Sequence, residues 1–230
     1  MTLKQFVKPA GAIAIFAAIV LAGMLSSSPR TRAIADDNES NESKIQRGFE
    51  IAPVPLNLAG KNRELVGLGS YIVNAQGDCN GCHSAGPATE FAPGGNPYFG
   101  QPEKINRATY LGGGRDFGPF PGPGPFPHIF TRNLTPDKTG RPEGGHSFSE
   151  FVQIIRTGED MDHLHATCTG APTGSCLPPP FDGTRLQIMP WPIYQHMTDH
   201  DLRAIYEYLS AIPCIDTIVS GQPQLRNDCQ

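Results

Sequence analysis

Two cysteines and a histidine, in the order Cys79-Asn80-Gly81-Cys82-His83, point most directly to chemistry in this chain. The C-x-x-C-H pattern is typical of covalent haem attachment. Two thiols three positions apart can each add to one vinyl group of a porphyrin, and the next residue then lies where its imidazole reaches the iron. Because the pattern occurs once, we expect one haem c, attached through Cys79 and Cys82 and ligated by His83.

Two other interpretations of the motif are weaker. A thioredoxin-like redox pair needs a βαβ context, and the sequence shows none. A zinc site needs a second paired cluster. His163 and His165 lack the usual spacing of such a cluster.

The second iron ligand has three candidates after the motif: Met161, Met189 and Met197. A methionine sulfur suits an electron-transfer haem. Met161 lies among acidic residues, and Met197 precedes a predicted helix in which it can serve for packing. Pro190 and Pro192 hold the chain around Met189 extended, so we predict Met189 as the ligand, with a buried packing methionine as the alternative.

The histidines outside the motif show no spacing that defines a second metal site. They are His128, His146, His163, His165, His196 and His200. Displacement of Met189 by one of them is the main alternative for the sixth ligand.

Four cysteines remain, and they permit three pairings. Proximity favours Cys168 with Cys176 and Cys214 with Cys229, which close two short loops. We expect both disulfides to be structural, with free or crossed thiols as the alternative.

The N-terminus has the order of an export signal. Lys4 and Lys8 precede an apolar run at 10–25, and Ala33-Ile34-Ala35 follows. This order predicts a signal peptide over residues 1–35, or a membrane anchor through residues 10–25, which is slightly short for a full span. Both predict an exported, periplasmic protein in an oxidising compartment.

Removal of residues 1–35 leaves 14 basic and 22 acidic side chains. So acidic a surface argues against nucleic acid as a partner. A partner protein with a basic docking face is the natural expectation.

The domain organisation follows from composition. Residues 36–59 are polar and then broken by prolines, which predicts a linker or an extended arm; residues 60–213 form the globular domain, and 214–230 a disulfide-tethered tail. Between residues 86 and 145 there are 13 glycines and 11 prolines, a density at which no regular element is expected. Its phenylalanines predict ordered wrapping over an apolar object, with a floppy insertion as the alternative.

Three helices are expected in the globular domain. Apolar spacing predicts a helix over 63–75. A capping box at Ser147 and Glu150 opens a second, to about Arg156, with Phe148, Val152 and Ile155 inward and Gly158 at its end. The third follows a cap at Thr198 or Asp199 and carries an inward stripe of Leu202, Ile205, Tyr206 and Leu209.

The run from Met189 to Leu209 resembles the distal-methionine segment and C-terminal helix of class I cytochromes c. The runs 133–137 and 156–158 are also similar to segments of the longer bacterial members, which include cytochrome subunits of periplasmic dehydrogenases. The resemblance covers roughly 64–213. It implies a mainly α, cytochrome c-like fold with long irregular loops, whose first and last helices cross beside the haem, and it places the ligand at Met189. Gly69 permits close approach of Tyr206 at such a crossing.

The sequence therefore predicts a mono-haem electron carrier or electron-accepting subunit, between an upstream dehydrogenase and a downstream oxidase or cytochrome. The alternative is a haem enzyme or ligand sensor with an exchangeable sixth position. No catalytic triad, carboxylate pair or nucleotide-binding loop is present in the sequence, which favours electron transfer over catalysis.

Overall fold

A computed structural model describes residues 29–217 and 227–229. The predicted anchor at residues 10–25 lies outside these ranges, as does the predicted signal peptide except for its residues 29–35. No helix in the described ranges is long and apolar enough to cross a bilayer. The chain divides into two compact units, residues 1–42 and 43–230. The first is described only as the helical residues 29–42, and the features that follow belong to the second.

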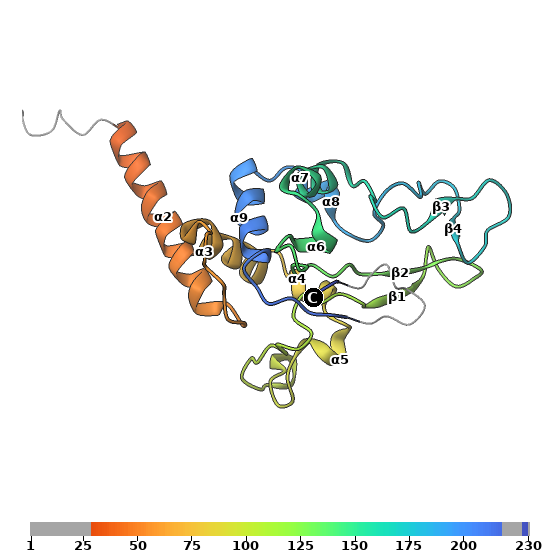
Figure 1. The fold of residues 1–230 in the computed structure, drawn as a ribbon, viewed down its shortest axis with the longest axis horizontal. Coiled ribbons are helices and arrows are strands. Elements are labelled where there is room, and N and C mark those ends of the chain that lie inside the picture. The colour runs from red at the N-terminus through yellow and green to blue at the C-terminus, as the bar shows by residue number, and fades with distance from the viewer. Residues whose placement is uncertain (1–28, 218–226, 230) are drawn as a thin grey trace, which may run out of the picture. The chain divides into compact units, whose positions relative to one another are not determined.

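Apart from α2, the elements are short, and long loops separate them (Figure 1). In chain order they are α2 (Pro29–Ile51), α3 (Arg63–Tyr71), the π-helical turn η1 (Ile72–Gln76), α4 (Cys79–His83), α5 (Pro87–Glu90), the 3-10 turn η2 (Pro97–Phe99), β1 (Asp116–Pro119), β2 (His128–Phe130), α6 (Pro142–Gly145), α7 (Phe148–Thr157), β3 (Ala166–Thr167), β4 (Cys176–Leu177), α8 (Trp191–Tyr194) and α9 (Asp199–Leu209). Strands β1 and β2 pair antiparallel, and β3 and β4 pair parallel.

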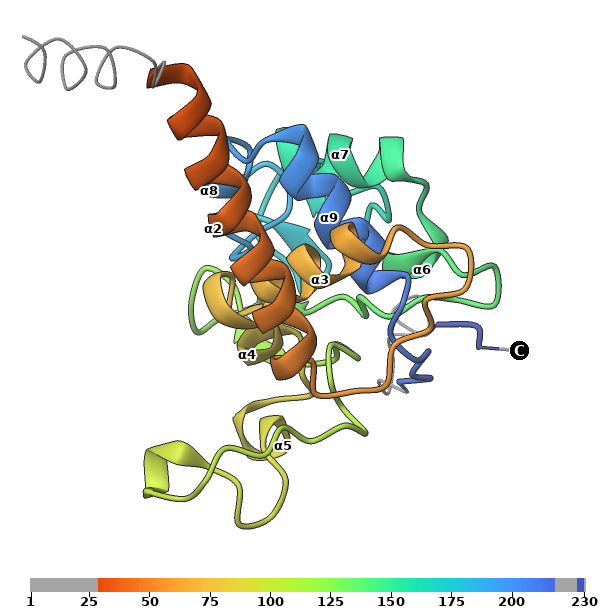
Figure 2. The ribbon, with the colours of Figure 1, turned by 90° about the vertical axis from the view of Figure 1, so that its left-hand side faces the viewer.

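Helices α3 and α9 form the centre of the fold and lie side by side in both views (Figures 1 and 2). Gly69 makes this contact possible, because a Cβ at Gly69 would lie 1.9 Å from the carbonyl oxygen of Ala204. The predicted close approach at Gly69 is confirmed, but its partner was wrong. The nearest atoms belong to Ala204 and Tyr208, whereas Tyr206 turns aside and donates a hydrogen bond to the carbonyl of His146 at 2.9 Å.

Both predicted ends of α7 and the predicted start of α9 agree with the structure, whereas the helix predicted over 63–75 is α-helical only to Tyr71 and continues as η1. Thr198 caps α9, and its hydroxyl accepts a hydrogen bond from Asp201 N. In α7 the Ser147–Glu150 capping box is present, and Gly158 ends the helix in a left-handed conformation with φ of 69°. The buried face of α7 is shifted from the prediction, because Phe151, Ile154 and Ile155 are its buried residues while Phe148 and Val152 remain partly exposed.

Residues 36–51 are helical, as part of α2, where we expected a linker. Its final turns pack on α3 through two glycines, since a Cβ at Gly48 would lie 1.9 Å from the carbonyl oxygen of Gly67. The Ser70 hydroxyl also donates to the Gly48 carbonyl at 2.7 Å. Tertiary contact therefore stabilises a helix that its polar composition did not predict.

The 86–145 segment is ordered and contributes to the core. Tyr110 and Leu111 are 1% and 0% exposed. The expectation of no regular element was wrong, because α5, η2, β1, β2 and α6 are all found here, each only three or four residues long.

The four cysteines outside the C-x-x-C-H motif form two disulfides, Cys168 to Cys176 and Cys214 to Cys229. The second bond joins the tail to the body beside Asn227. This asparagine is 2% exposed and donates to the carbonyl of Thr135 at 2.6 Å. A buried side-chain hydrogen bond and a covalent bond thus hold the same segment.

Candidate functional site

The Cys79–His83 motif forms a helix of its own, α4, directly after η1. Asp78 turns the chain between the two helices, with a left-handed φ of 45°. Cys79 and Cys82 are free thiols. Both line one cavity together with His83, so the fold presents the three motif residues to a common space.

The wall of this cavity is largely apolar and comes from segments far apart in the sequence. Its apolar members include Ile72, Val73, Leu134, Phe151, Ile155, Pro190, Leu202, Ile205 and Leu209. A porphyrin is a flat and mostly apolar ring that is stabilised by burial in such surroundings. The composition of the wall therefore fits a haem.

His83 is oriented by a hydrogen bond to the backbone. Its Nδ1 lies 2.8 Å from the carbonyl oxygen of Arg132. Because a carbonyl oxygen can only accept, Nδ1 carries the proton and the lone pair is left on Nε2. Burial lowers the pKa of His83 and so favours the neutral imidazole. A neutral imidazole fixed through its other nitrogen is the usual form of a metal-ligating histidine.

The Cys79 thiol is protonated at neutral pH. Burial, helped by the nearby Asp78 and Cys82, raises the pKa of this thiol to about 12. Cys79 is therefore a thiol and not a thiolate, the form that acts as nucleophile. The described residues also contain no group of three or more His, Cys, Asp or Glu side chains that could hold a metal ion.

The three candidate methionines are placed differently. Met189 and Met197 both line the cavity that contains His83, and Met161 does not. Met189 also lines a smaller adjoining cavity with His83, Phe117 and Phe130, from which Met197 is absent. The structure thus brings together His83 and Met189, the two residues predicted as iron ligands, and leaves Met197 as a second sulfur nearby.

The backbone around Met189 is bent, and the expectation of an extended segment was wrong. Met189 N donates to the carbonyl of Gln187 at 2.7 Å, and Trp191 N donates to the carbonyl of Met189 at 2.9 Å. Ile188 has a φ of 68°, which is strained for a β-branched residue. Two successive tight turns therefore bring Met189 to the cavity that contains His83. From the sequence, the stiffness of the neighbouring prolines alone was expected to place it.

Trp191 holds this bend against the end of α7. Its indole ring covers Gly158, where a Cβ would lie 2.2 Å from a ring atom, and its Nε1 donates to the carbonyl of Leu186 at 3.2 Å. Leu186 N in turn donates to the carbonyl of Gly158 at 2.7 Å. Trp191 therefore anchors the bend that carries Met189 to the C-terminal end of α7.

None of the six other histidines lines either apolar cavity. His128 contacts Asp116 at 2.8 Å, and His146 lies 3.9 Å from Glu150. None of the six is therefore placed to replace Met189. The other four are His163, His165, His196 and His200.

Glu143 is a member of the site that sequence reasoning missed. It lines the cavity with His83 and Met189, and its Oε2 is buried without a hydrogen-bond partner among the described residues. Burial raises the pKa of Glu143 to about 7, against the opposing effect of Arg132. A glutamate in a Pro-Glu-Gly-Gly turn normally points into water, so no sequence signal could have found it.

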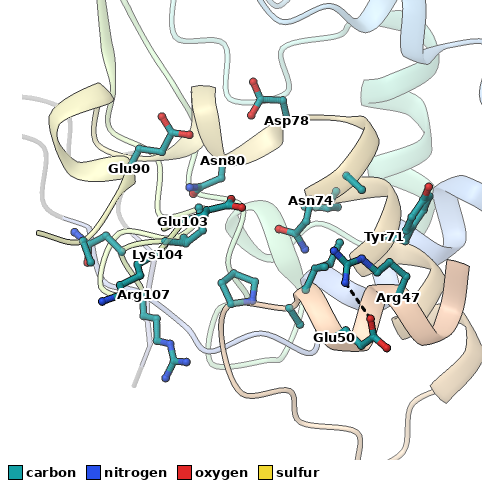
Figure 3. Close-up of a pocket in the computed structure, with 18 of the residues that line it drawn as sticks. Arg47, Glu50, Tyr71, Asn74, Asp78, Asn80, Glu90, Glu103, Lys104 and Arg107 are labelled. Carbon is teal, nitrogen blue, oxygen red and sulfur yellow. Dashed lines mark hydrogen bonds and ion pairs between the residues drawn. The ribbon is translucent and has the colours of Figure 1, made fainter. Parts of the chain in front are cut away.

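A polar cleft adjoins the apolar cavity and shares Val73 and Asp78 with it (Figure 3). Its charged side chains are Arg47, Glu50, Asp78, Glu90, Glu103, Lys104 and Arg107. Opposite charges are mixed along the wall, so the cleft favours neither an anion nor a cation.

The chain is similar to the gluconate 2-dehydrogenase cytochrome c subunit of Pantoea cypripedii, with 30% identity over 147 residues. The match covers 64% of this chain and 23% of that subunit, so the chain spans about a quarter of its relative. The name of that relative describes it as the cytochrome c subunit of a dehydrogenase. No family model matches the chain, and no solved structure matches it.

Proposed function

We propose that this chain is an exported cytochrome c-like protein that carries one covalent haem c, has His/Met iron ligation and transfers single electrons. One observation carries the proposal. Two free thiols, a neutral imidazole with its Nε2 lone pair available and a methionine sulfur all line one apolar cavity. Residues 60–213 then correspond to a mainly α cytochrome c domain.

Each residue has a distinct role in this proposal. Cys79 and Cys82 would form the thioethers, and His83 and Met189 would bind the iron. The Arg132 carbonyl holds the imidazole ring in one tautomer. The apolar wall excludes water and so favours the less charged reduced state. The bound haem supplies the one-electron chemistry.

The partners follow from charge and from the named relative. The acidic chain suits a partner with a basic docking face, and the similar protein is itself a dehydrogenase subunit. We therefore assign an upstream dehydrogenase as the electron donor and a downstream oxidase or cytochrome as the acceptor. The export signal in the sequence supports a periplasmic location, with or without anchoring through residues 10–25.

Covalent attachment is tested by producing the chain in a periplasm with haem-maturation enzymes and extracting it with acid-acetone. The colour should stay with the wild-type polypeptide. It should become extractable in the Cys79→Ala plus Cys82→Ala variant. Complete loss of colour from the wild-type protein would refute the proposal.

Met189 ligation is tested with the weak far-red band of a sulfur–Fe(III) bond. The band should be present in wild type and absent in Met189→Ala. Met197→Ala is the matched control, because Met197 lines the same cavity and should leave the band in place. The reverse outcome would make Met197 the ligand.

Carbon monoxide separates the carrier from an enzyme or sensor. A haem with both axial positions filled should show almost no spectral change when CO is added to the reduced protein. Rapid CO binding by the wild-type protein would indicate an exchangeable sixth position.

A further inference from the structure

Among the described residues that line the cavity with Cys79, Cys82 and His83, Glu143 is the one acidic residue with a buried carboxylate oxygen that has no hydrogen-bond partner. Its Oε2 has no hydrogen-bond partner, although the atom is shielded from solvent. The residue is held there by a left-handed backbone, with a φ of 52° and a ψ of 58°. A left-handed backbone at a partly buried glutamate, one of whose carboxylate oxygens is buried without a partner, is a sign of function.

The cation that acts on the Glu143 carboxyl is already engaged in ion pairs with other carboxylates. Arg132 acts on Glu143, but its guanidinium is ion-paired to Asp160 at 2.6 Å and to Asp162 at 2.7 Å. The two negative charges of Asp160 and Asp162 therefore already exceed the single positive charge of Arg132. Ionised Glu143 adds a further negative charge that nothing in the cluster compensates.

The other titratable groups around the cavity do not compensate this charge either. Those that line it with Glu143 are Asp78, Cys79, Cys82, His83 and Tyr194. His83 is neutral, both cysteines are consumed by attachment in the proposed function, and Asp78 is itself acidic. His146, which follows α6, lies against Glu150. Glu143 thus ionises next to the redox centre with little local neutralisation.

We propose that Glu143 is a proton-binding site linked to the redox state of the haem, so that electron transfer in this protein is coupled to proton transfer. This rests on the proposed function. When the site gains one electron from the donor protein, the Glu143 carboxylate takes up one proton from solvent and becomes a carboxylic acid. When the electron leaves, the proton returns to solvent. No other bond is made or broken.

The coupling is electrostatic and reciprocal. An added electron raises the proton affinity of a nearby acid, and a negative acid disfavours the added electron. The effect is strong where the surroundings are apolar, as in this cavity. The midpoint potential should therefore fall as pH rises through the range in which Glu143 ionises, which the raised pKa of Glu143 places near neutrality.

Redox titrations of the haem-loaded protein, followed by its visible spectrum from about pH 5 to about pH 9, test this coupling. The wild-type potential should fall with pH around neutrality. Glu143→Gln should stay near the wild-type acid-side value throughout, because glutamine mimics the protonated acid. The propionates of the haem are present in both proteins, so the difference between the two curves reports Glu143.

Glu150→Gln is the matched control. It removes one carboxylate from α7, the next helix, but Glu150 is 48% exposed and its pKa is lowered by hydrogen bonds to Ser147. The control should keep the wild-type pH dependence. Equal slopes for wild type and Glu143→Gln would overturn the inference.

Proton uptake by the wild-type protein gives a second readout that needs no variant. Reduction in weakly buffered solution near pH 7, with a pH indicator dye, should consume a measurable fraction of one proton per haem. Absence of uptake would overturn the inference even if Glu143→Gln fails to mature. A protein without covalent haem would instead refute the proposed function, so the two failures are distinguishable.

Discussion

The Nδ1 atom of His83 lies 2.8 Å from the carbonyl oxygen of Arg132, a residue 49 positions later in the chain. The guanidinium of the same arginine pairs with Asp160 and Asp162, in the loop after α7. Arg132 therefore links α4, which carries the motif, to the segment that leads toward Met189. Its backbone orients the proposed iron ligand, and its side chain holds the loop.

Loss of the Arg132 side chain should be strongly destabilising. Arg132→Met leaves Asp160, whose side chain is 7% exposed, without its cation, and breaking a buried pair on one side costs about 3–5 kcal/mol. Urea unfolding of the haem-loaded protein measures this loss. Arg47→Met is the control, because Arg47 and Glu50 form an exposed pair worth less than about 1 kcal/mol. Similar losses in both variants would contradict the structural role given to Arg132.

A methyl group at Gly69 should force α3 and α9 apart. In Gly69→Ala the new Cβ meets the backbone of Ala204, which cannot move aside as a flexible side chain would. We expect a loss of about 3 kcal/mol or more in the free energy of unfolding. Gly174→Ala, with nothing within 4 Å of its Cβ, should change stability by less than about 0.5 kcal/mol. An unchanged urea midpoint in Gly69→Ala would show that the helices do not pack this closely.

Gly158→Ala should weaken the sulfur–iron bond without touching Met189. The added methyl displaces the Trp191 ring, which anchors the bend two residues after Met189. The far-red band should lose intensity, and stability should fall by about 1–3 kcal/mol. Gly140→Ala separates the clash from backbone strain, since Gly140 also has a positive φ, of 78°, but nothing lies within 4 Å of its Cβ. A normal band in Gly158→Ala would mean that Trp191 does not position the ligand.

Glu143 should make stability depend on pH. Its folded-state pKa, about 7, lies above the ordinary value of 4.5, so the unfolded chain releases this proton at lower pH than the folded protein. The group's contribution to stability is therefore full below about pH 4.5 and is lost as pH rises to about 7, by up to about 3 kcal/mol. Urea unfolding at about pH 5 and pH 8 should show Glu143→Gln gaining stability relative to wild type at the higher pH. The same difference at both pH values would contradict the raised pKa.

Local signals predicted the helix ends well. Ser147 with Glu150, Gly158 and Thr198 each act within a few residues of their own backbone, so their hydrogen bonds and left-handed conformations can be read from neighbours in the sequence. The helix over 36–51 could not be read in this way. Its polar residues carry little helical signal, and its final turns are stabilised by Gly48 lying against Gly67 of another helix.

The sequence by itself determined the chemistry that this protein can offer. A C-x-x-C-H motif, two further cysteine pairs and a methionine before the last helix are patterns of spacing along the chain, which folding does not alter. Only the tertiary structure decided which groups share a cavity. It placed Met189 and Met197 there without Met161, gave His83 the carbonyl of Arg132, and buried one carboxylate oxygen of Glu143. These relationships depend on packing between segments far apart in the chain, and burial is what turns an ordinary turn glutamate into an acid that ionises near neutral pH.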